Sequence, residues 1–168
     1  PALLANDDPV PAEAVLHYPG GLSDYLNNAT ADAALLVSTP FADLVELDGQ
    51  KFEWAITWLG AGEDGFFHSY CNTVPTPSGG THEAGFRQAI TRALRSFGDL
   101  AGNRKAAEIT ADDVFAGPAV MLSVFLRDPQ FQGQTKDRLV SADATRQTEQ
   151  AARDRFEQWL AADAARAN

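Results

Sequence analysis

The sequence contains very few of the residues that build covalent or metal-based scaffolds. It has a single cysteine, Cys71, and three histidines. A lone cysteine excludes an internal disulfide framework and leaves no pair of cysteines at zinc-ligand spacing. We therefore expect an intracellular protein of a reducing compartment, with no metal held by this chain.

Long apolar runs are also missing. No stretch of 18 or more apolar residues occurs, and the start at Pro1 has no basic segment of the kind that opens a secretion signal. The chain has 168 residues, 45% of them hydrophobic, which suits one globular domain. It does not begin with Met, and its last residues are rich in Ala and charge. We expect a piece of a longer protein with no membrane partner.

Positive charge is scarce in the first half. Residues 1–80 contain one basic residue, Lys51, against eleven Asp and Glu, whereas residues 81–138 contain eight Lys and Arg against seven acids. The net charge of -10 disfavours a general nucleic-acid binder, because duplex DNA repels an acidic surface. Any surface that faces an anion is therefore expected in the middle third.

The spacing of apolar residues predicts an α+β domain with four or five strands and helices packed on one face. An extended lead-in is expected at about 1–11, a short strand at 14–18, a helix at 22–29 and an antiparallel meander over 35–73, with a hairpin turn at Asp48-Gly49. Farther along, we expect a helix from Thr81 to about Gly98, a short helix from Thr110, an interior strand over 119–126 and a final helix over 142–166.

A short polar loop follows the interior strand and carries Gln134, Thr135 and Lys136. A lysine is a compact charge with three donors, so a fixed loop could aim Lys136 at phosphate oxygens. The alternative is an ordinary solvated surface lysine.

A second motif, Gly79-Gly80-Thr81-His82-Glu83, stands directly before the helix expected from Thr81. Its glycines could present amide groups to an anion, or they could make a tight turn with Thr81 as the helix cap, which we favour. For His82 a structural hydrogen bond is expected rather than catalysis.

Two apparent metal sites are disfavoured. His68 and Cys71 would lie on opposite faces of a strand, which disfavours a ligand set with His82. Asp112 and Asp113 could be read as metal ligands or an acid and base pair, but acids at the start of a helix are far commoner.

Together, two long runs of the sequence resemble one protein family. They are Asn72-Thr-Val-Pro-Thr-Pro-Ser-Gly-Gly-Thr-His-Glu83 and Pro129-Gln-Phe-Gln-Gly-Gln-Thr-Lys-Asp-Arg-Leu139. In this order and spacing they resemble the transducer domain in the B subunit of bacterial type IIA topoisomerases. The resemblance also takes in residues 18–25, 54–58 and the terminal helix, so it covers nearly the whole chain. The run from Ser69 to Gly80 is more similar to the topoisomerase IV branch than to the gyrase branch.

The resemblance implies a single transducer domain over 1–168, including the lead-in and the exit helix of about 142–166, within a longer subunit. The implied fold is the ribosomal-protein-S-five-domain-two-like sheet with a left-handed βαβ crossover, which GHMP kinases share. General rules would favour a right-handed crossover, so the handedness rests on the resemblance alone.

For the polar loop, the resemblance implies that Gln134 and Lys136 touch the γ-phosphate of ATP. ATP and Mg²⁺ would be held mainly by a GHKL-type domain absent from this chain. Lys136 would be the catalytic, electrostatic element and Gln134 the positioning one. Because this contact exists only while the γ-phosphate is present, it would couple hydrolysis to domain motion.

For the helix after Thr81, the resemblance implies that Arg92, helped by Arg95, faces DNA in a cavity between two B subunits. The alternative is a solvated helix face. The implied partners are the GHKL and Toprim domains of the same subunit, a second B subunit, the topoisomerase IV A subunit and duplex DNA in the bacterial cytoplasm.

The implied function is ATP-dependent strand passage by a type II DNA topoisomerase. The chain has neither the GHKL nucleotide motifs nor the acidic cluster of a Toprim domain, so we expect the isolated chain to be inactive. The nearest alternative is the same domain of gyrase. A GHMP-type small-molecule kinase would need a glycine- and serine-rich phosphate loop that the sequence lacks, and the acidic first half disfavours an RNA-binding module.

Overall fold

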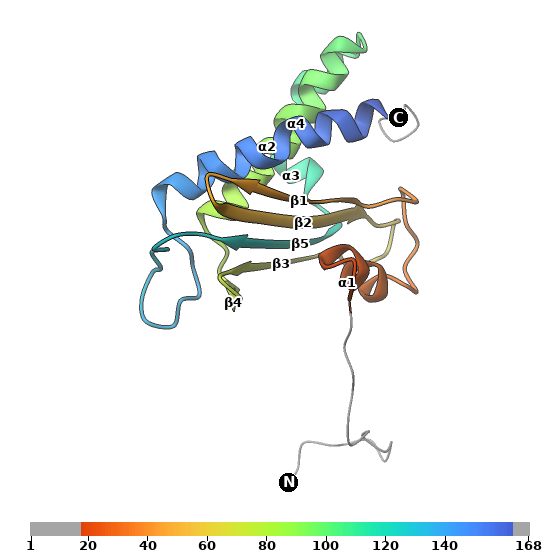
Figure 1. Cartoon of the computed structure of the whole chain (residues 1–168). Helices are drawn as coiled ribbons and strands as arrows, with labels where there is room; N and C mark the ends of the chain where they lie inside the picture. The colour runs from red at the N-terminus through yellow and green to blue at the C-terminus, as the bar shows by residue number, and fades with distance from the viewer. Residues whose placement is uncertain (1–17, 163–168) are drawn as a thin grey trace, which may run out of the picture.

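A five-stranded mixed sheet forms the centre of the computed structural model, which describes residues 18–162 (Figure 1). The strands are β1 (Phe41–Leu47), β2 (Gln50–Trp58), β3 (Phe66–Cys71), β4 (Val74–Pro75) and β5 (Pro118–Phe125). The helices are α1 (Leu22–Ala29), α2 (Thr81–Leu100), the 3-10 helix η1 (Arg104–Glu108), α3 (Ala111–Val114) and α4 (Ala142–Ala161). Within residues 18–162, no helix is long and apolar enough to cross a membrane.

Strands β1 and β2 form the predicted hairpin. They pair antiparallel up to Leu47 and Gln50, and both turn residues, Asp48 and Gly49, have positive φ angles of 53° and 71°. Two consecutive positive φ angles are typical of a type I′ turn, whose twist matches that of the flanking strands. The Asp-Gly pair therefore fixes the register of the hairpin.

The predicted meander ends after β2. The sheet order is β1-β2-β5-β3-β4, so β5 lies between β2 and β3, pairing antiparallel with the first and parallel with the second. Seven of the eight β5 residues are buried, and a strand that is apolar on both faces is stable only in the interior of a sheet. The expectation that β3 follows β2 in space is therefore wrong.

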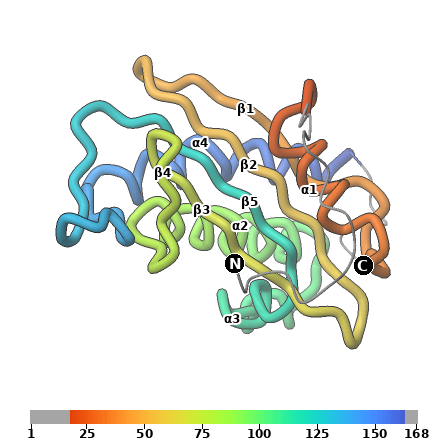
Figure 2. Tube along the Cα trace, turned by 90° about the horizontal axis from the view of Figure 1, so that it is seen from below, coloured from red at the N-terminus to blue at the C-terminus, as the bar shows by residue number. Residues whose placement is uncertain are grey.

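The connection from β3 to β5 passes through α2 and is the left-handed crossover that the resemblance implied. Figure 2 shows the strands in front and α2 behind them as the chain leaves one end of β3 and returns to the other end of β5. The sequence patterns alone favoured the opposite hand.

Helices cover both faces of the sheet, not one. The long helices α2 and α4 lie against the face that presents Phe52, Trp54 and Ile56. The short helix α1 packs Leu26 on the opposite face, against Ala55 and Met121. Because β2 and β5 carry apolar side chains on both sides, the second face also has to be shielded from water.

Most predicted boundaries hold, with two corrections. Helix α2 continues past Gly98 to Leu100. Gly98 does not end the helix, and its missing side chain leaves room for Ala106 of η1 to pack against it. Thr81 is the first residue of α2, and Gly80 occupies the cap position. The predicted lead-in, residues 14–17 of the first strand and the last residues of the exit helix lie outside the described residues.

Candidate functional site

The polar loop leaves the end of β5 and projects beyond the edge of the sheet before it reaches α4 (Figure 1). Gln134, Thr135 and Lys136 at its tip are all exposed. Gly133 and Lys136 have positive φ angles of 73° and 58°, so the tip is a tight turn. The Lys136 Nζ lies 5.9 Å from the centre of the Phe131 ring.

The base of this loop is closed by backbone hydrogen bonds. Gln132 donates its amide hydrogen to the Arg138 carbonyl oxygen at 2.9 Å, and Val140 donates to the Gln130 carbonyl at 2.8 Å. These bonds surround an antiparallel bridge between Phe131 and Leu139. The tip is thus presented on a short two-stranded stem.

The stem is joined to the Gly79-Gly80 turn by a second, parallel ladder. Thr81 donates its amide hydrogen to the Leu139 carbonyl at 3.0 Å, and Leu139 donates to the Gly79 carbonyl at 3.1 Å. Farther toward the tip, Ser78 donates to the Asp137 carbonyl at 2.9 Å. The two motifs, about 50 residues apart in the sequence, therefore form one structural unit.

The glycine turn serves packing, and two of its amides have partners within the protein. Gly79 donates its amide to the Thr76 carbonyl at 2.8 Å, and the Thr81 amide is used by Leu139. These bonds favour the tight-turn interpretation over anion binding. The predicted Thr81 cap is wrong, because its buried hydroxyl has no hydrogen-bond partner among residues 18–162.

A series of hydrogen-bonded polar side chains lies beneath the turn. Ser69 on β3 donates its hydroxyl hydrogen to Glu83 Oε1 at 2.6 Å. The Thr76 hydroxyl lies 2.6 Å from the Ser69 oxygen and 3.1 Å from His82 Nε2. Since the Ser69 hydrogen is used by Glu83, Thr76 donates to Ser69 and His82 Nε2 donates to Thr76.

Burial shifts the pKa of both titratable groups in this hydrogen-bonded series, His82 and Glu83. Desolvation lowers the pKa of His82 to about 4, so the ring is neutral near pH 7. Desolvation raises the pKa of Glu83, while the Ser69 hydrogen bond and the charges of Arg87 and Arg138 act in the opposite direction. His82 is fully buried and makes the structural hydrogen bond that the sequence suggested.

The structure also places the residues of the two disfavoured metal sites. His68 is exposed, whereas Cys71 is buried and its pKa is raised to about 11 by desolvation. Asp113 accepts hydrogen bonds from Thr110 in a capping box, as expected of an acid that begins a helix. No cluster of three metal-ligating side chains occurs in the part of the chain that the structure describes.

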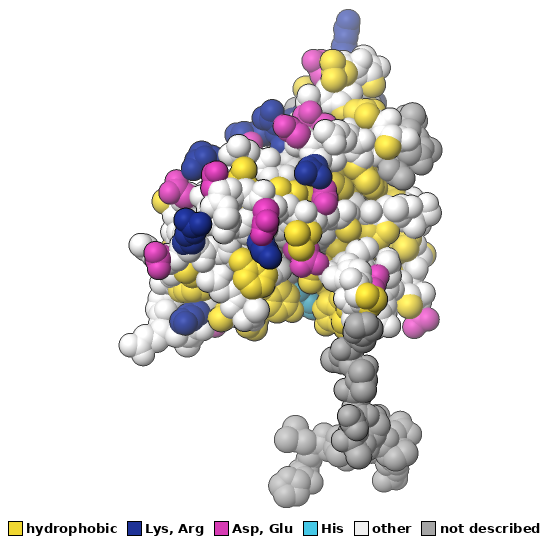
Figure 3. Space-filling view, viewed as in Figure 1, with side chains coloured by type: hydrophobic (Ala, Val, Ile, Leu, Met, Phe, Trp, Pro, Cys, Tyr) yellow, Lys and Arg dark blue, Asp and Glu magenta, His cyan; other side chains and the backbone are white. Residues whose placement is uncertain are grey.

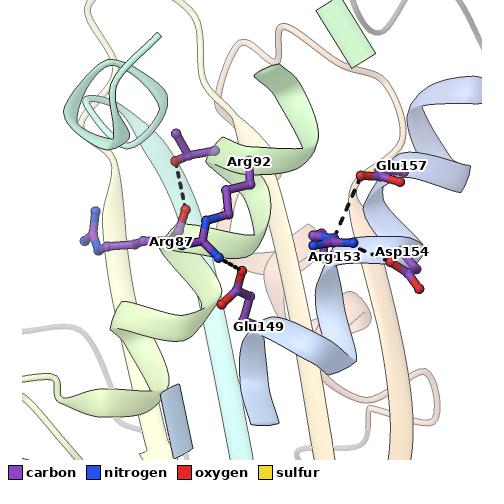
Figure 4. Close-up of polar contacts among 7 residues, drawn as sticks. Arg87, Arg92, Glu149, Arg153, Asp154 and Glu157 are labelled. Carbon is purple, nitrogen blue, oxygen red and sulfur yellow. Dashed lines mark hydrogen bonds and ion pairs between the residues drawn. The ribbon is translucent and has the colours of Figure 1, made fainter. Parts of the chain in front are cut away.

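Arg92 and Arg95 both contact the protein's own surface. Arg92 extends from α2 to form an ion pair with Glu149 of α4, and the two side chains are 58% and 17% exposed (Figure 4). Arg95 donates from Nε to the Ile109 carbonyl at 2.6 Å, just after η1. Both arginines lie about three to four helical turns from the start of α2, away from the Lys136 loop.

The charge on the face drawn in Figure 3 is mixed. Figure 3 shows Lys and Arg side chains interspersed with Asp and Glu, with no single-sign basic patch on the face in view. On α4, Arg153 lies beside Asp154 and Glu157 at 3.6 and 4.0 Å. A phosphate that approached Arg92 would have to compete with Glu149.

Sequence reasoning did not predict the contributions of Ser69, Thr76 and Glu83. Each lies inside or next to the motif that ends at Glu83, but none of them was assigned a role in a hydrogen-bond network. No local pattern indicates that β3 lies beneath the glycine turn, because this depends on the parallel pairing of β3 with β5.

Comparison with known proteins places the chain in a family. The family model described as DNA gyrase B matches residues 21–168. The B subunit of DNA topoisomerase 4 from Caulobacter vibrioides is 48% identical over 158 residues, covering 91% of this chain and 23% of that protein. The Bartonella bacilliformis protein of the same name is 46% identical over 163 residues, covering 96% of this chain and 23% of the relative. The chain thus spans about a quarter of the length of these relatives.

Solved structures agree with the sequence matches. The 43K ATPase domain of Thermus thermophilus gyrase B has a TM-score of 0.77 and 28% identity, covering 88% of this chain and 40% of that one. The topoisomerase IV ATP-binding domain of Francisella tularensis has a TM-score of 0.77 and 30% identity, covering 90% and 41%. Because the family model and these relatives match most of its length and the solved structures share its fold, the chain belongs to the DNA gyrase B family.

Proposed function

We propose that this chain is the transducer part of an ATP-dependent type II DNA topoisomerase of the topoisomerase IV kind. The observation that carries the proposal is the placement of Gln134 and Lys136 at the exposed tip of a loop anchored by two backbone ladders. Such a loop can reach a nucleotide in a neighbouring domain without losing its shape.

The chemistry of Lys136 fits a phosphate group. Among residues 18–162, no carboxylate forms an ion pair with its ammonium group, so the charge is available to an anion. In phosphoryl transfer the protein contributes mainly positioning and charge stabilisation. Lys136 stabilises the negative charge of the γ-phosphate, and Gln134 orients that group.

ATP and Mg²⁺ are bound mainly by another domain of the same subunit. Within residues 18–162, no three His, Cys, Asp or Glu side chains are grouped so that they could hold a metal ion. Mg²⁺ would neutralise phosphate charge from the GHKL-type domain of the same subunit.

The loop also couples the nucleotide to the rest of the domain. Its stem pairs with residues 78–81, which lead directly into α2. Because a γ-phosphate contact favours one inter-domain angle, hydrolysis releases that preference. The two long helices then carry the change in angle toward the DNA-cleaving parts of the enzyme.

Arg92, with Arg95 as its helper, is the DNA-facing residue of the proposal. Arg92 is more than half exposed on α2 and can exchange Glu149 for a DNA phosphate. Phosphate contacts carry no sequence information, which suits a duplex that has to be held loosely and released.

The remaining partners are the Toprim domain of the same subunit, a second B subunit, the topoisomerase IV A subunit and duplex DNA, in the bacterial cytoplasm. The relatives named as B subunits of topoisomerase 4, with identities such as 48% and 46%, favour this branch over gyrase. Gyrase stays the second candidate, since the gyrase B structure of Thermus thermophilus has the same TM-score of 0.77. The GHMP-kinase alternative is not better supported than this function.

The test is the Lys136→Ala variant of the intact B subunit. Removing one preorganised charge donor should lower the ATP turnover rate by roughly two to three orders of magnitude, with a smaller effect on nucleotide affinity. Lys105→Ala, an exposed lysine of η1 at the other end of α2, is the matched control and should keep wild-type turnover. Wild-type turnover in Lys136→Ala would show that Lys136 is an ordinary solvated surface lysine and would overturn the proposal.

A further inference from the structure

Glu83 occupies a position where four parts of the molecule meet. Its carboxylate accepts a hydrogen bond from Ser69 of β3 at 2.6 Å. The same carboxylate lies against the turn, since a Cβ placed on Gly79 would be 2.8 Å from Oε2. The positive charges of Arg87, on the same helix, and Arg138, in the loop stem, act on it.

Placing a charged carboxylate here has an energetic cost. Glu83 is half-buried, and desolvation is the largest influence on its pKa. An acid in the first turn of α2 could also interact with the helix dipole while exposed to water, as Asp112 is in the first turn of α3. The helix dipole therefore does not account for the buried position of Glu83.

The surroundings of Glu83 connect the sheet to the loop. Ser69 belongs to β3, between β5 and β4 in the sheet, whereas Arg138 stands two residues after Lys136 and donates from Nη1 to the Ser78 carbonyl at 3.1 Å. The ladder between residues 78–81 and 137–139 lets the turn and the stem shift only as one body. The bond from Glu83 to Ser69 fixes that body to the sheet.

We propose that Glu83 is a positioning residue for ATP hydrolysis, which sets the place of Lys136 by fixing the glycine turn and the Arg138 stem to Ser69 of β3. This inference rests on the proposed function, because it assigns Glu83 to the same γ-phosphate contact. Glu83 touches neither ATP nor Mg²⁺ and acts through Lys136 alone.

The experiment is a double-mutant cycle in the intact B subunit, with Glu83→Ala, Lys136→Ala and the double variant. Because misplacing a catalytic group by about 1 Å can lower a rate 100-fold, Glu83→Ala should reduce kcat for ATP roughly ten- to hundred-fold with little change in KM. In the Lys136→Ala background, the same substitution should have no further effect on kcat.

Two further variants separate positioning from folding. Glu83→Gln keeps an acceptor for the Ser69 hydroxyl and should retain more turnover than Glu83→Ala. Ser69→Ala removes the bond from the other side and should lower kcat in the same Lys136-dependent way, even if Glu83→Ala fails to fold. Asp112→Ala, which alters an exposed acid in the first turn of α3, is the control and should leave kcat unchanged.

The outcomes distinguish the two proposals. If Lys136→Ala lowers turnover but Glu83→Ala and Ser69→Ala do not, or if their effects persist in full in the Lys136→Ala background, the positioning role is wrong and the proposed function stands. If Lys136→Ala keeps wild-type turnover, both proposals fall together.

Discussion

The backbone of Gly80 lies directly against the backbone of Leu139, in a parallel bridge that joins the two polar motifs. A Cβ atom built on Gly80 would lie 2.7 Å from the Leu139 amide nitrogen, and the φ angle of Gly80 is 145°. Only glycine combines that φ angle with so close an approach of a second chain segment. The Gly79-Gly80 pair therefore allows the close backbone pairing that holds the base of the Lys136 loop.

Replacing Gly80 with alanine should separate the two motifs. The new methyl group meets backbone atoms that cannot move independently, and the φ angle is unfavourable for any L residue. We expect the free energy of unfolding to fall by more than about 1 kcal/mol, measured by urea denaturation. In the intact subunit, ATP turnover should fall as well.

Two other glycines serve as controls for this substitution. Gly62 has a positive φ of 93° but no neighbour within 4 Å, and Gly117 also has no neighbour within 4 Å, with no positive φ. Gly62→Ala should show only the cost of the backbone angle, and Gly117→Ala almost none. A Gly80→Ala variant no less stable than Gly62→Ala would contradict the close approach of Leu139.

The isolated chain should bind ATP weakly and should not hydrolyse it. Lys136 and Gln134 supply one side of a phosphate contact, whereas the adenine pocket, the Mg²⁺ ligands and the general base are assigned to another domain. Calorimetry and a phosphate-release assay on the purified chain measure both properties. Sub-micromolar ATP binding or sustained turnover would contradict the division of the site and revive the kinase alternative.

Local signals in the sequence predicted those features that depend on neighbouring residues. The Asp48-Gly49 turn, the short helix opened by Thr110 and the buried strand over 119–126 were all visible, because each follows from the chemistry of a few adjacent side chains. The family resemblance added the crossover hand, which patterns in a single chain do not contain.

Features that depend on distant pairing could not be predicted in the same way. The place of β5 between β2 and β3 follows from a parallel pairing with no signature in loop length or turn type. The Thr81 cap was expected because threonine is a common cap residue, yet the helix begins one residue earlier, with Gly80 in the cap position and its carbonyl accepting from the Ala84 amide at 3.1 Å. The ion pair between Arg92 and Glu149, 57 residues apart, is likewise a tertiary feature.

His82 should make the protein sensitive to acid. Burial lowers its pKa from 6.5 to about 4, so the unfolded chain binds a proton at a higher pH than the folded one. Its contribution to stability is complete above pH 6.5 and is lost as the pH falls toward 4. A shift of this size corresponds to roughly 3 kcal/mol at most. Urea denaturation at several pH values from about 7.5 to 4 measures this loss.

The His82→Gln variant isolates this contribution from the carboxylates. Glutamine can still donate a hydrogen bond to Thr76 but does not titrate, so the difference between variant and wild type should shrink or reverse as the pH is lowered. Glu83, whose pKa is raised, works in the opposite direction and is present in both proteins. An unchanged pH dependence in His82→Gln would show that His82 does not cause the acid sensitivity.

Arg92→Gln should separate DNA coupling from folding. The Arg92 side chain is 58% exposed and its ion pair with Glu149 is partly solvated, so its loss should change stability by no more than about 1 kcal/mol. Basal ATPase of the intact subunit should survive, because Arg92 lies away from the Lys136 loop. DNA-stimulated ATPase and strand passage should fall together, and low salt should partly restore them.

Glu149→Gln is the matched control, since it breaks the same ion pair but leaves Arg92 in place and free of its carboxylate partner. Both variants should lose similar stability, yet Glu149→Gln should keep or increase DNA-stimulated ATPase, because a DNA phosphate no longer competes with a carboxylate for the guanidinium. If both variants lose DNA stimulation equally, the ion pair between α2 and α4 matters, and not a contact with DNA. If Arg92→Gln keeps full strand passage at physiological salt, Arg92 does not face the duplex.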